Sequence, residues 1–164
     1  MKFQKLKKDK LKKTKRMSNK TENKSVLLSL SNNLMVKDVE KTISYYNNIG
    51  FKTVYKSTED GVIYWAFVKK NEVELFFQSN TSLTDEFPEL KNQEKGGALT
   101  LWFRVENIDQ WYQEIKNKTE IIKPFGITSY NGAKEFVVKD INGFILHFSD
   151  FDLNKALNNL QLEL

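Results

Sequence analysis

Between residues 26 and 150, short runs of alternating apolar and polar residues predict β-strands, and two runs with apolar residues three or four apart predict helices. The two helices are expected to begin after Asp38 and Asn107, which are residue types that cap helix N-termini. A polar pair, Lys70-Asn71, is expected to form a hairpin turn. The predicted strands are residues 25–36, 51–57, 61–69, 72–79, 98–105, 120–126, 133–140 and 143–150.

The second half of this pattern repeats the first. The stretches "VKDVEKTISYY" and "VENIDQWYQEI" align at a shift of 69 residues, and "VELFF" and "FILHF" align at a shift of about 71. Such self-similarity predicts two copies of one unit that share a core. The expected fold class is α+β, with two βαβββ modules forming a curved, barrel-like sheet that has helices on its convex side. The expected segments are a basic disordered tail (1–25), module one (26–79), a linker (80–97), module two (98–150) and a C-terminal helical extension (151–164).

Side chains alternate between the two faces of a strand, which assigns one face of each predicted sheet to the core. In residues 98–105, Leu101 and Phe103 share the face under the helix, and Trp102 lies on the opposite face. An uncovered trough of large aromatic side chains needs a ligand or a partner. The alternative is that these side chains fill a dry barrel centre or a dimer interface. The residues expected on the open faces include Trp65, Phe67, Phe76, Trp102 and His147.

The net charge of +5 is unevenly distributed. Residues 1–24 contain eleven Lys/Arg and two Asp/Glu, so the rest of the chain is mildly acidic, with 15 basic and 19 acidic residues. A nucleic-acid-binding domain carries its basic surface on the fold, so nucleic acid is not an expected partner, although the tail could touch phosphates weakly. The tail is expected to be a solvated, disordered extension, and Met17 is an alternative start.

No apolar run approaches the roughly 18 residues of a membrane span, and the basic N-terminus lacks the apolar stretch of a signal peptide. We therefore expect a cytoplasmic protein without a membrane partner. The chain has no cysteine, which excludes disulfides, thiolate nucleophiles and cysteine-metal sites.

The stretches "VKDVEKTISYYNNIGF" and "KEFVVKDINGFILHF" resemble the opening and closing patterns of the vicinal oxygen chelate superfamily, which includes glyoxalase I, extradiol dioxygenases and bleomycin resistance proteins. The resemblance covers about residues 26–150. The loop "DINGF" departs from the usual Asp-Pro-Asp-Gly-Asn. The resemblance implies metal ligands, in the metal-dependent members, at positions that here are Ser31, Phe76, Thr100 and His147.

Of these four positions only His147, the single histidine, coordinates transition metals strongly, and one imidazole with two hydroxyls is a poor metal cage. We therefore expect no metal ligand, no cofactor and no catalytic residue. The alternative is a metal-dependent enzyme of the glyoxalase/dioxygenase type with an atypical site.

Within the superfamily the chain most resembles the bleomycin resistance proteins, which lack the metal set and commonly end with a His-Phe pair, here His147-Phe148. This resemblance implies a homodimer whose two clefts lie between chains, often with an exchanged N-terminal strand. It also implies binding, without chemical change, of a planar, cationic glycopeptide antibiotic similar to bleomycin. A third possibility is a protein of the same fold that binds another small molecule, or only itself.

On this reading each candidate binding residue has an expected role. Trp102 is the main stacking platform, since aromatic faces stack on flat heterocycles and attract cations. Three aromatic residues form the cleft wall, one aromatic lies in a mobile loop, two carboxylates are anionic partners, and the histidine is a hydrogen bonder. These are, in order, Tyr55, Trp65 and Phe67; Tyr130; Glu74 and Glu135; and His147. For each residue the alternative is an ordinary core, turn or solvated position.

Overall fold

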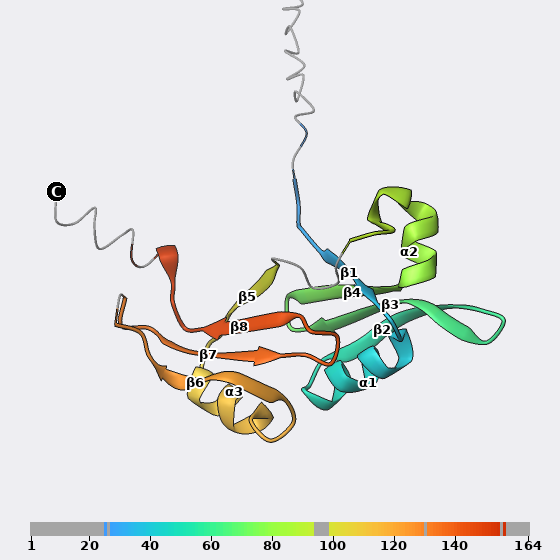
Figure 1. The fold of residues 1–164 in the computed structure, drawn as a ribbon. Coiled ribbons are helices and arrows are strands. Elements are labelled where there is room, and N and C mark those ends of the chain that lie inside the picture. The colour runs from blue at the N-terminus through green and yellow to red at the C-terminus, as the bar shows by residue number, and fades with distance from the viewer. Residues whose placement is uncertain (1–24, 26, 94–98, 130, 155, 157–164) are drawn as a thin grey trace, which may run out of the picture.

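The computed structural model describes residues 25, 27–93, 99–129, 131–154 and 156. The chain folds into two four-stranded mixed sheets with the same topology, in the orders β1-β4-β3-β2 and β5-β8-β7-β6 (Figure 1). In each sheet the first strand pairs with the fourth in parallel, and the other pairings are antiparallel. The strands are β1 (Asn32–Val36), β2 (Lys52–Glu59), β3 (Val62–Lys70), β4 (Val73–Ser79), β5 (Thr100–Arg104), β6 (Glu120–Ile127), β7 (Lys134–Lys139) and β8 (Ile145–Ser149). The predicted pair of βαβββ modules and the α+β class are thereby confirmed.

One helix follows the first strand of each module. Helix α1 (Val39–Asn48) begins at Asp38, whose side chain accepts a hydrogen bond from the backbone N–H of Lys41, as expected of an N-cap. Helix α3 (Ile108–Ile115) follows Asn107, which makes no side-chain cap and instead has a left-handed backbone with φ of 55°. The sequence pattern thus predicted both helix starts correctly. The predicted side-chain cap is present at α1 and absent at α3.

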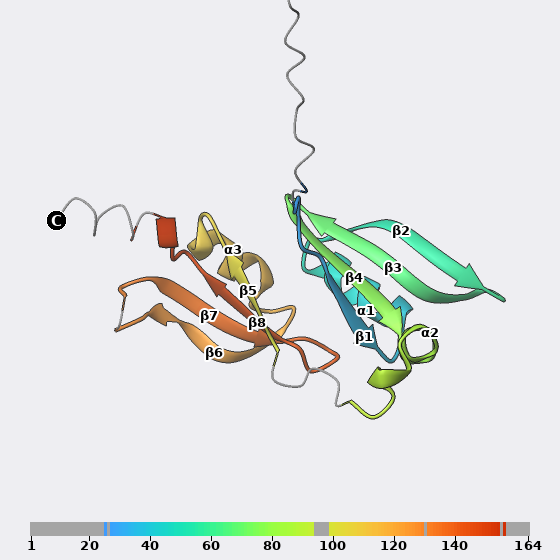
Figure 2. The same cartoon turned by 90° about the horizontal axis from the view of Figure 1, so that it is seen from above.

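Both helices lie on the same side of the molecule, below the sheets in Figure 1. The faces of the sheets toward the helices are apolar and buried, with Ala66, Val68 and Phe77 under α1 and Leu101 and Phe148 under α3. The two sheets curve but do not close into a barrel, and they lie side by side when seen from above (Figure 2). On the other side of the first sheet, helix α2 (Asn80–Glu86) packs against β4 and β1, and among the described residues no helix covers the corresponding face of the second sheet (Figure 1).

Several contacts join the two modules. The hydroxyl of Tyr46 on α1 donates to the buried carboxylate of Asp140 at 2.9 Å, and burial together with this carboxylate raises the pKa of Tyr46. The ammonium of Lys70 lies 4.5 Å from the centre of the Trp111 ring on α3. One core cluster of buried residues spans both modules.

The turn of the first hairpin differs from the prediction. Residues Asn71 and Glu72, rather than Lys70-Asn71, connect β3 and β4, so that Lys70 pairs with Val73 and Phe67 pairs with Phe76. The predicted register was therefore wrong by two residues. Because the side-chain period of a strand is two, the assignment of residues to faces was still correct.

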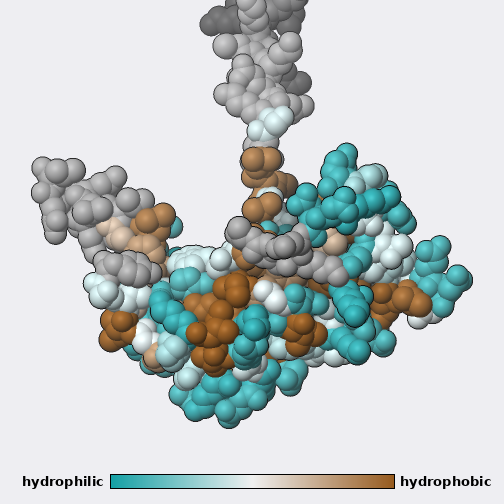
Figure 3. All heavy atoms as spheres, viewed as in Figure 1, coloured by the Kyte–Doolittle hydropathy of each residue, from teal (hydrophilic) through white to brown (hydrophobic). Residues whose placement is uncertain are grey.

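Two segments outside the strands also differ from the expectation. The expected linker contains helix α2 (Asn80–Glu86) and a short 3-10 turn (Pro88–Leu90). The first strand begins at Asn32 rather than at residue 25, and the segment before it leaves apolar side chains in solvent. Figure 3 shows apolar surface where the chain approaches β1. Three leucines of this segment, Leu27, Leu28 and Leu30, are 100%, 91% and 88% exposed.

Parts of the expected organisation lie outside the described residues, namely almost all of the basic tail and most of the C-terminal extension. Among the residues that the structure does describe, no helix is long and apolar enough to span a membrane.

Candidate functional site

The open face of the second sheet brings Trp102 and His147 together. Parallel pairing of β5 with β8 places the two residues directly beside each other. Their rings lie 6.3 Å apart between centroids and nearly perpendicular, with an interplanar angle of 83°. The side chain of Trp102 is 49% exposed, whereas tryptophan side chains in folded proteins are on average highly buried. The sequence placed both residues on this face, and the structure does the same.

The open face of the first sheet carries a cluster of four aromatic rings. Trp65 and Phe67 on β3 each lie 5.1 Å from the Phe76 ring on β4, and Tyr55 on β2 lies 6.1 Å from Trp65. Tyr55 is 59% exposed, and the other three rings are partly buried by one another. The structure thus groups the predicted wall residues on one face, opposite the helix-covered core.

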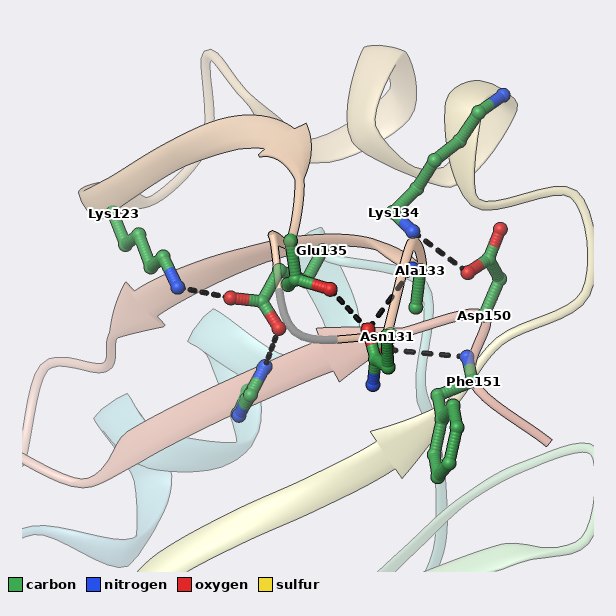
Figure 4. Close-up of polar contacts among 10 residues, drawn as sticks. Lys123, Asn131, Ala133, Lys134, Glu135, Asp150 and Phe151 are labelled. Carbon is green, nitrogen blue, oxygen red and sulfur yellow. Dashed lines mark hydrogen bonds and ion pairs between the residues drawn. The ribbon is translucent and has the colours of Figure 1, made fainter. Parts of the chain in front are cut away.

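A buried carboxylate lies beside the histidine on the second sheet. Glu135 on β7 is only 2% exposed, and its Oε2 lies 3.0 Å from Nε2 of His147. Its other carboxylate oxygen, Oε1, forms an ion pair with Lys123 of β6 (Figure 4). Burial by itself raises the pKa of Glu135, but the hydrogen bonds from Lys123 and His147 outweigh burial and hold the pKa below its usual range.

The sequence analysis missed Lys123, because a lysine in a short strand beside Pro124 looks like an ordinary solvated residue. A signal was nonetheless present, since the antiparallel partner strand carries the candidate carboxylate Glu135, and a buried carboxylate needs a partner. Register between β6 and β7 is irregular around Lys123, and only the folded ladder decides which residue lies next to Glu135.

The other predicted anionic residue is also paired. Glu74 on β4 accepts a hydrogen bond from Lys69 at 3.1 Å and a longer one from the hydroxyl of Ser31 at 3.4 Å. Both candidate carboxylates therefore have a lysine partner within the chain. A cationic ligand would have to compete with these lysines, so the aromatic faces rather than the carboxylates are the main candidate contacts.

A polar group that the sequence did not single out lies between the first sheet and α2. Gln78 on β4 is buried, accepts a hydrogen bond from Asn33 of β1 at 2.6 Å, and donates to Ser82 and Glu86 of α2. Asn33 pairs with Phe76 across the parallel ladder as Trp102 pairs with His147. At corresponding points the first sheet thus has an amide where the second has an exposed indole.

The same ladders correct the expected metal positions. The residues beside Phe76 and His147 are Asn33 and Trp102, two residues beyond Ser31 and Thr100. Neither an amide nor an indole supplies the missing imidazole or carboxylate. Within the described ranges no group of three or more His, Cys, Asp or Glu side chains could hold a metal ion. These side chains do not fit the divalent ion of the metal-dependent superfamily members.

A cavity of about 530 Å³ lies elsewhere, between the turn of the first hairpin and the edge of the second module. Its walls include Phe51, Lys70, Phe103 and Trp111, and none of the predicted binding residues lines it. In a single chain the predicted aromatic surfaces are open faces rather than an enclosed pocket, so a ligand would be enclosed there only if another surface covered them. The remaining predicted residue, Tyr130, lies outside the described residues.

The fold and these faces define a class of two-module α+β proteins whose sheets each expose an aromatic surface away from the helices. A family model described as Glyoxalase/Bleomycin resistance protein/Dioxygenase superfamily matches residues 28–148. The chain therefore belongs to the glyoxalase/bleomycin resistance protein/dioxygenase superfamily. A search among curated protein sequences finds no match.

Solved structures share the fold at low sequence identity. A bleomycin-binding protein complexed with bleomycin is 16% identical, with a TM-score of 0.56 over 77% of this chain and 100% of its own. The bleomycin-binding protein from Streptomyces verticillus, complexed with copper(II)-bleomycin, is 17% identical, with a TM-score of 0.57 over 79% and 100%. A glyoxalase/bleomycin resistance protein/dioxygenase family enzyme from Burkholderia phytofirmans PsJN is 14% identical, with a TM-score of 0.60 over 73% and 94%. At these identities the likeness shows the fold alone.

Proposed function

We propose that this protein binds a planar, cationic glycopeptide antibiotic of the bleomycin type without chemical change, in clefts formed by a homodimer. The observation that carries the proposal is the half-exposed indole of Trp102 on a sheet face that none of the described helices covers. The indole stacks on a flat heterocycle of the ligand, while Tyr55, Trp65 and Phe67 form the facing wall. Stacking and cation–π contact attract a flat cationic molecule, and each adds about 0.5–1.5 kcal/mol to its binding.

A second copy of the chain supplies the missing side of the cleft in this proposal. The aromatic clusters of the two modules lie on separate open sheets, and neither is enclosed within one chain. The exposed leucines before β1 offer apolar area to a partner, since monomeric proteins rarely leave such residues grouped in water. In the dimer the open face of one module meets that of the partner subunit, and the two faces bracket the ligand.

Solved relatives support this choice of ligand. Two bleomycin-binding proteins share the fold over the whole of their length, and each is solved with bleomycin. The donor set around His147 supports binding rather than metal-assisted chemistry, because the one neighbouring carboxylate already serves Lys123 and the imidazole. The roles of Glu74, Glu135 and Tyr130 toward a cationic ligand remain part of the proposal.

Calorimetric titration of the full chain with copper-loaded bleomycin tests the proposal. We expect saturable binding, and we expect Trp102→Ala to weaken it by about tenfold, which corresponds to the loss of about 1.4 kcal/mol of stacking. Trp102→Phe should retain part of the affinity, since a phenyl ring still stacks.

Phe87→Ala is a matched control, because Phe87 is similarly exposed at 47% but lies at the end of α2. It should leave the affinity unchanged. Absence of saturable binding, or an affinity insensitive to Trp102→Ala, would refute the proposed ligand class.

A further inference from the structure

The carboxylate of Glu135 constrains the protonation of His147. An ionised carboxylate accepts hydrogen bonds and donates none, and the low pKa of Glu135 keeps it ionised at neutral pH. The nitrogen of His147 that faces Glu135 at 3.0 Å is Nε2. The contact is a hydrogen bond only if Nε2 carries the proton, so a singly protonated imidazole must have its lone pair on Nδ1.

The second ring nitrogen is available to a ligand. Within the part of the chain that the structure describes, Nδ1 of His147 has no hydrogen-bond partner, and it is not among the buried polar atoms that lack one. The side chain is 21% exposed on the same open face as Trp102. The two rings are in edge contact, so a flat molecule that covers the indole also borders the imidazole.

We propose that Glu135 holds His147 as the Nε2–H tautomer, and that Nδ1 consequently selects planar ligands that carry a hydrogen-bond donor at the ring edge. This inference rests on the proposed function in placing the ligand against Trp102. The ligand chemistry that fits is an aromatic ring with an N–H, amino or ammonium group. A ring that has only acceptors at that edge should bind less tightly, because it cannot donate a hydrogen bond to the lone pair of Nδ1.

The charged groups around the imidazole agree with this arrangement. Glu135 faces it from β7, Lys123 of β6 binds the same carboxylate, and Arg104 on β5 is paired with Asp152 at 2.7 Å. Lys123 neutralises Glu135 without touching its hydrogen bond to the imidazole. Both partners of Glu135 therefore leave Nδ1 of His147 facing the open side of the sheet.

The tautomer can be read in the free protein, because His147 is the only histidine in the chain. In the neutral imidazole, nitrogen-15 NMR of the full chain should show a protonated Nε2 and an unprotonated Nδ1. In Glu135→Gln the amide can donate as well as accept, and the share of the Nε2–H tautomer should fall. Glu120→Gln alters an exposed ion pair between Glu120 of β6 and Lys139 of β7, and it should leave the spectrum of the imidazole unchanged.

Selection of donors is tested with indole and benzofuran, two flat probes of similar shape that differ in a ring N–H. Indole should bind about two- to tenfold more tightly and should shift the Nδ1 resonance, and His147→Phe should abolish the difference. A dominant Nδ1–H tautomer, equal affinity for the two probes, or no binding of indole would overturn the inference. Because the NMR measurement uses no antibiotic, failure of copper-bleomycin to bind would refute the proposed function while leaving the tautomer result standing.

Discussion

Glu135 illustrates how one residue can combine burial with charge. A carboxylate with almost no exposed surface is costly unless its oxygens are satisfied, and here one oxygen pairs with Lys123 while the other pairs with His147. The two partners of this carboxylate are the ammonium of Lys123 and the imidazole of His147. This arrangement orients His147 on the open face and ties β6, β7 and β8 together.

We predict that Glu135→Gln lowers the free energy of unfolding by about 1.5–3 kcal/mol at neutral pH, because hydrogen bonds to a charged group are lost. The folded state holds the pKa of Glu135 below its usual value. The stabilisation by the carboxylate is therefore complete above about pH 4.3, the value in an unfolded chain, and is lost as the pH falls through the folded pKa.

Urea denaturation at a series of pH values measures this effect. The wild-type chain should lose stability below about pH 4.3 more steeply than Glu135→Gln, whereas Glu120→Gln should follow the wild type because its ion pair is exposed. Parallel curves for the wild type and Glu135→Gln would show that the buried ion pair contributes no pH dependence.

The two helices α1 and α3 occupy equivalent places in the repeat but begin differently. Asp38 caps α1 through the backbone N–H of Lys41, whereas Asn107 uses its tolerance of a left-handed backbone before α3. Asparagine can serve in either way, since its short side chain favours both caps and left-handed conformations. Only the backbone angles distinguish the two roles.

Substitutions at Asp38 and Asn107 should therefore affect the free energy of unfolding for different reasons. Asp38→Ala should destabilise the fold by about 0.5–2 kcal/mol through loss of the cap. Asn107→Gly should be tolerated or slightly stabilising, while Asn107→Ala should cost about 1 kcal/mol because alanine resists φ of 55°. Thermal or urea unfolding of the three variants measures this, and a stability loss in Asn107→Gly as large as in Asn107→Ala would contradict a conformational role.

At the scale of the whole molecule, the two modules share a core on the helix side but leave separate faces open on the other. Within the described residues each sheet has two edge strands that are paired on one side only, β1 and β2 in the first sheet and β5 and β6 in the second. Such edges are usually covered or paired in stable proteins. The apolar segment before β1 continues from one of these edges, which is why we assign it to a contact with a second copy.

Replacement of Leu27, Leu28 and Leu30 by serine should therefore convert the proposed dimer to monomers. Burial of a leucine side chain contributes about 1.5–3 kcal/mol, so loss of three weakens association by several orders of magnitude. Sedimentation velocity of the full chain at several concentrations measures the change. Ile141→Ser is the control, since Ile141 is 55% exposed in the turn between β7 and β8 and should not affect assembly.

A wild-type chain that sediments as a monomer at all concentrations would remove the dimer from the proposed function. A dimer that persists in the triple variant would instead show that the contact lies elsewhere on the chain.

The amino-acid sequence by itself determined the repeated module, the two helices, the α+β class and the face on which Trp65, Phe67, Trp102 and His147 lie. These features follow from local periodicity, because strand alternation assigns a face even when the register is wrong by two residues, as it was at Asn71. The superfamily resemblance came from two short stretches near the ends of the same pattern.

Only the tertiary structure decided which polar groups meet. The contacts of Glu135 with Lys123 and His147, and of Gln78 with α2, join residues whose pairing depends on ladder register and loop path rather than on neighbours in sequence. Local propensity also could not reveal that residues 27–31 lie outside the sheet. An apolar run of this kind forms a strand only where a neighbouring strand pairs with its backbone hydrogen-bonding groups.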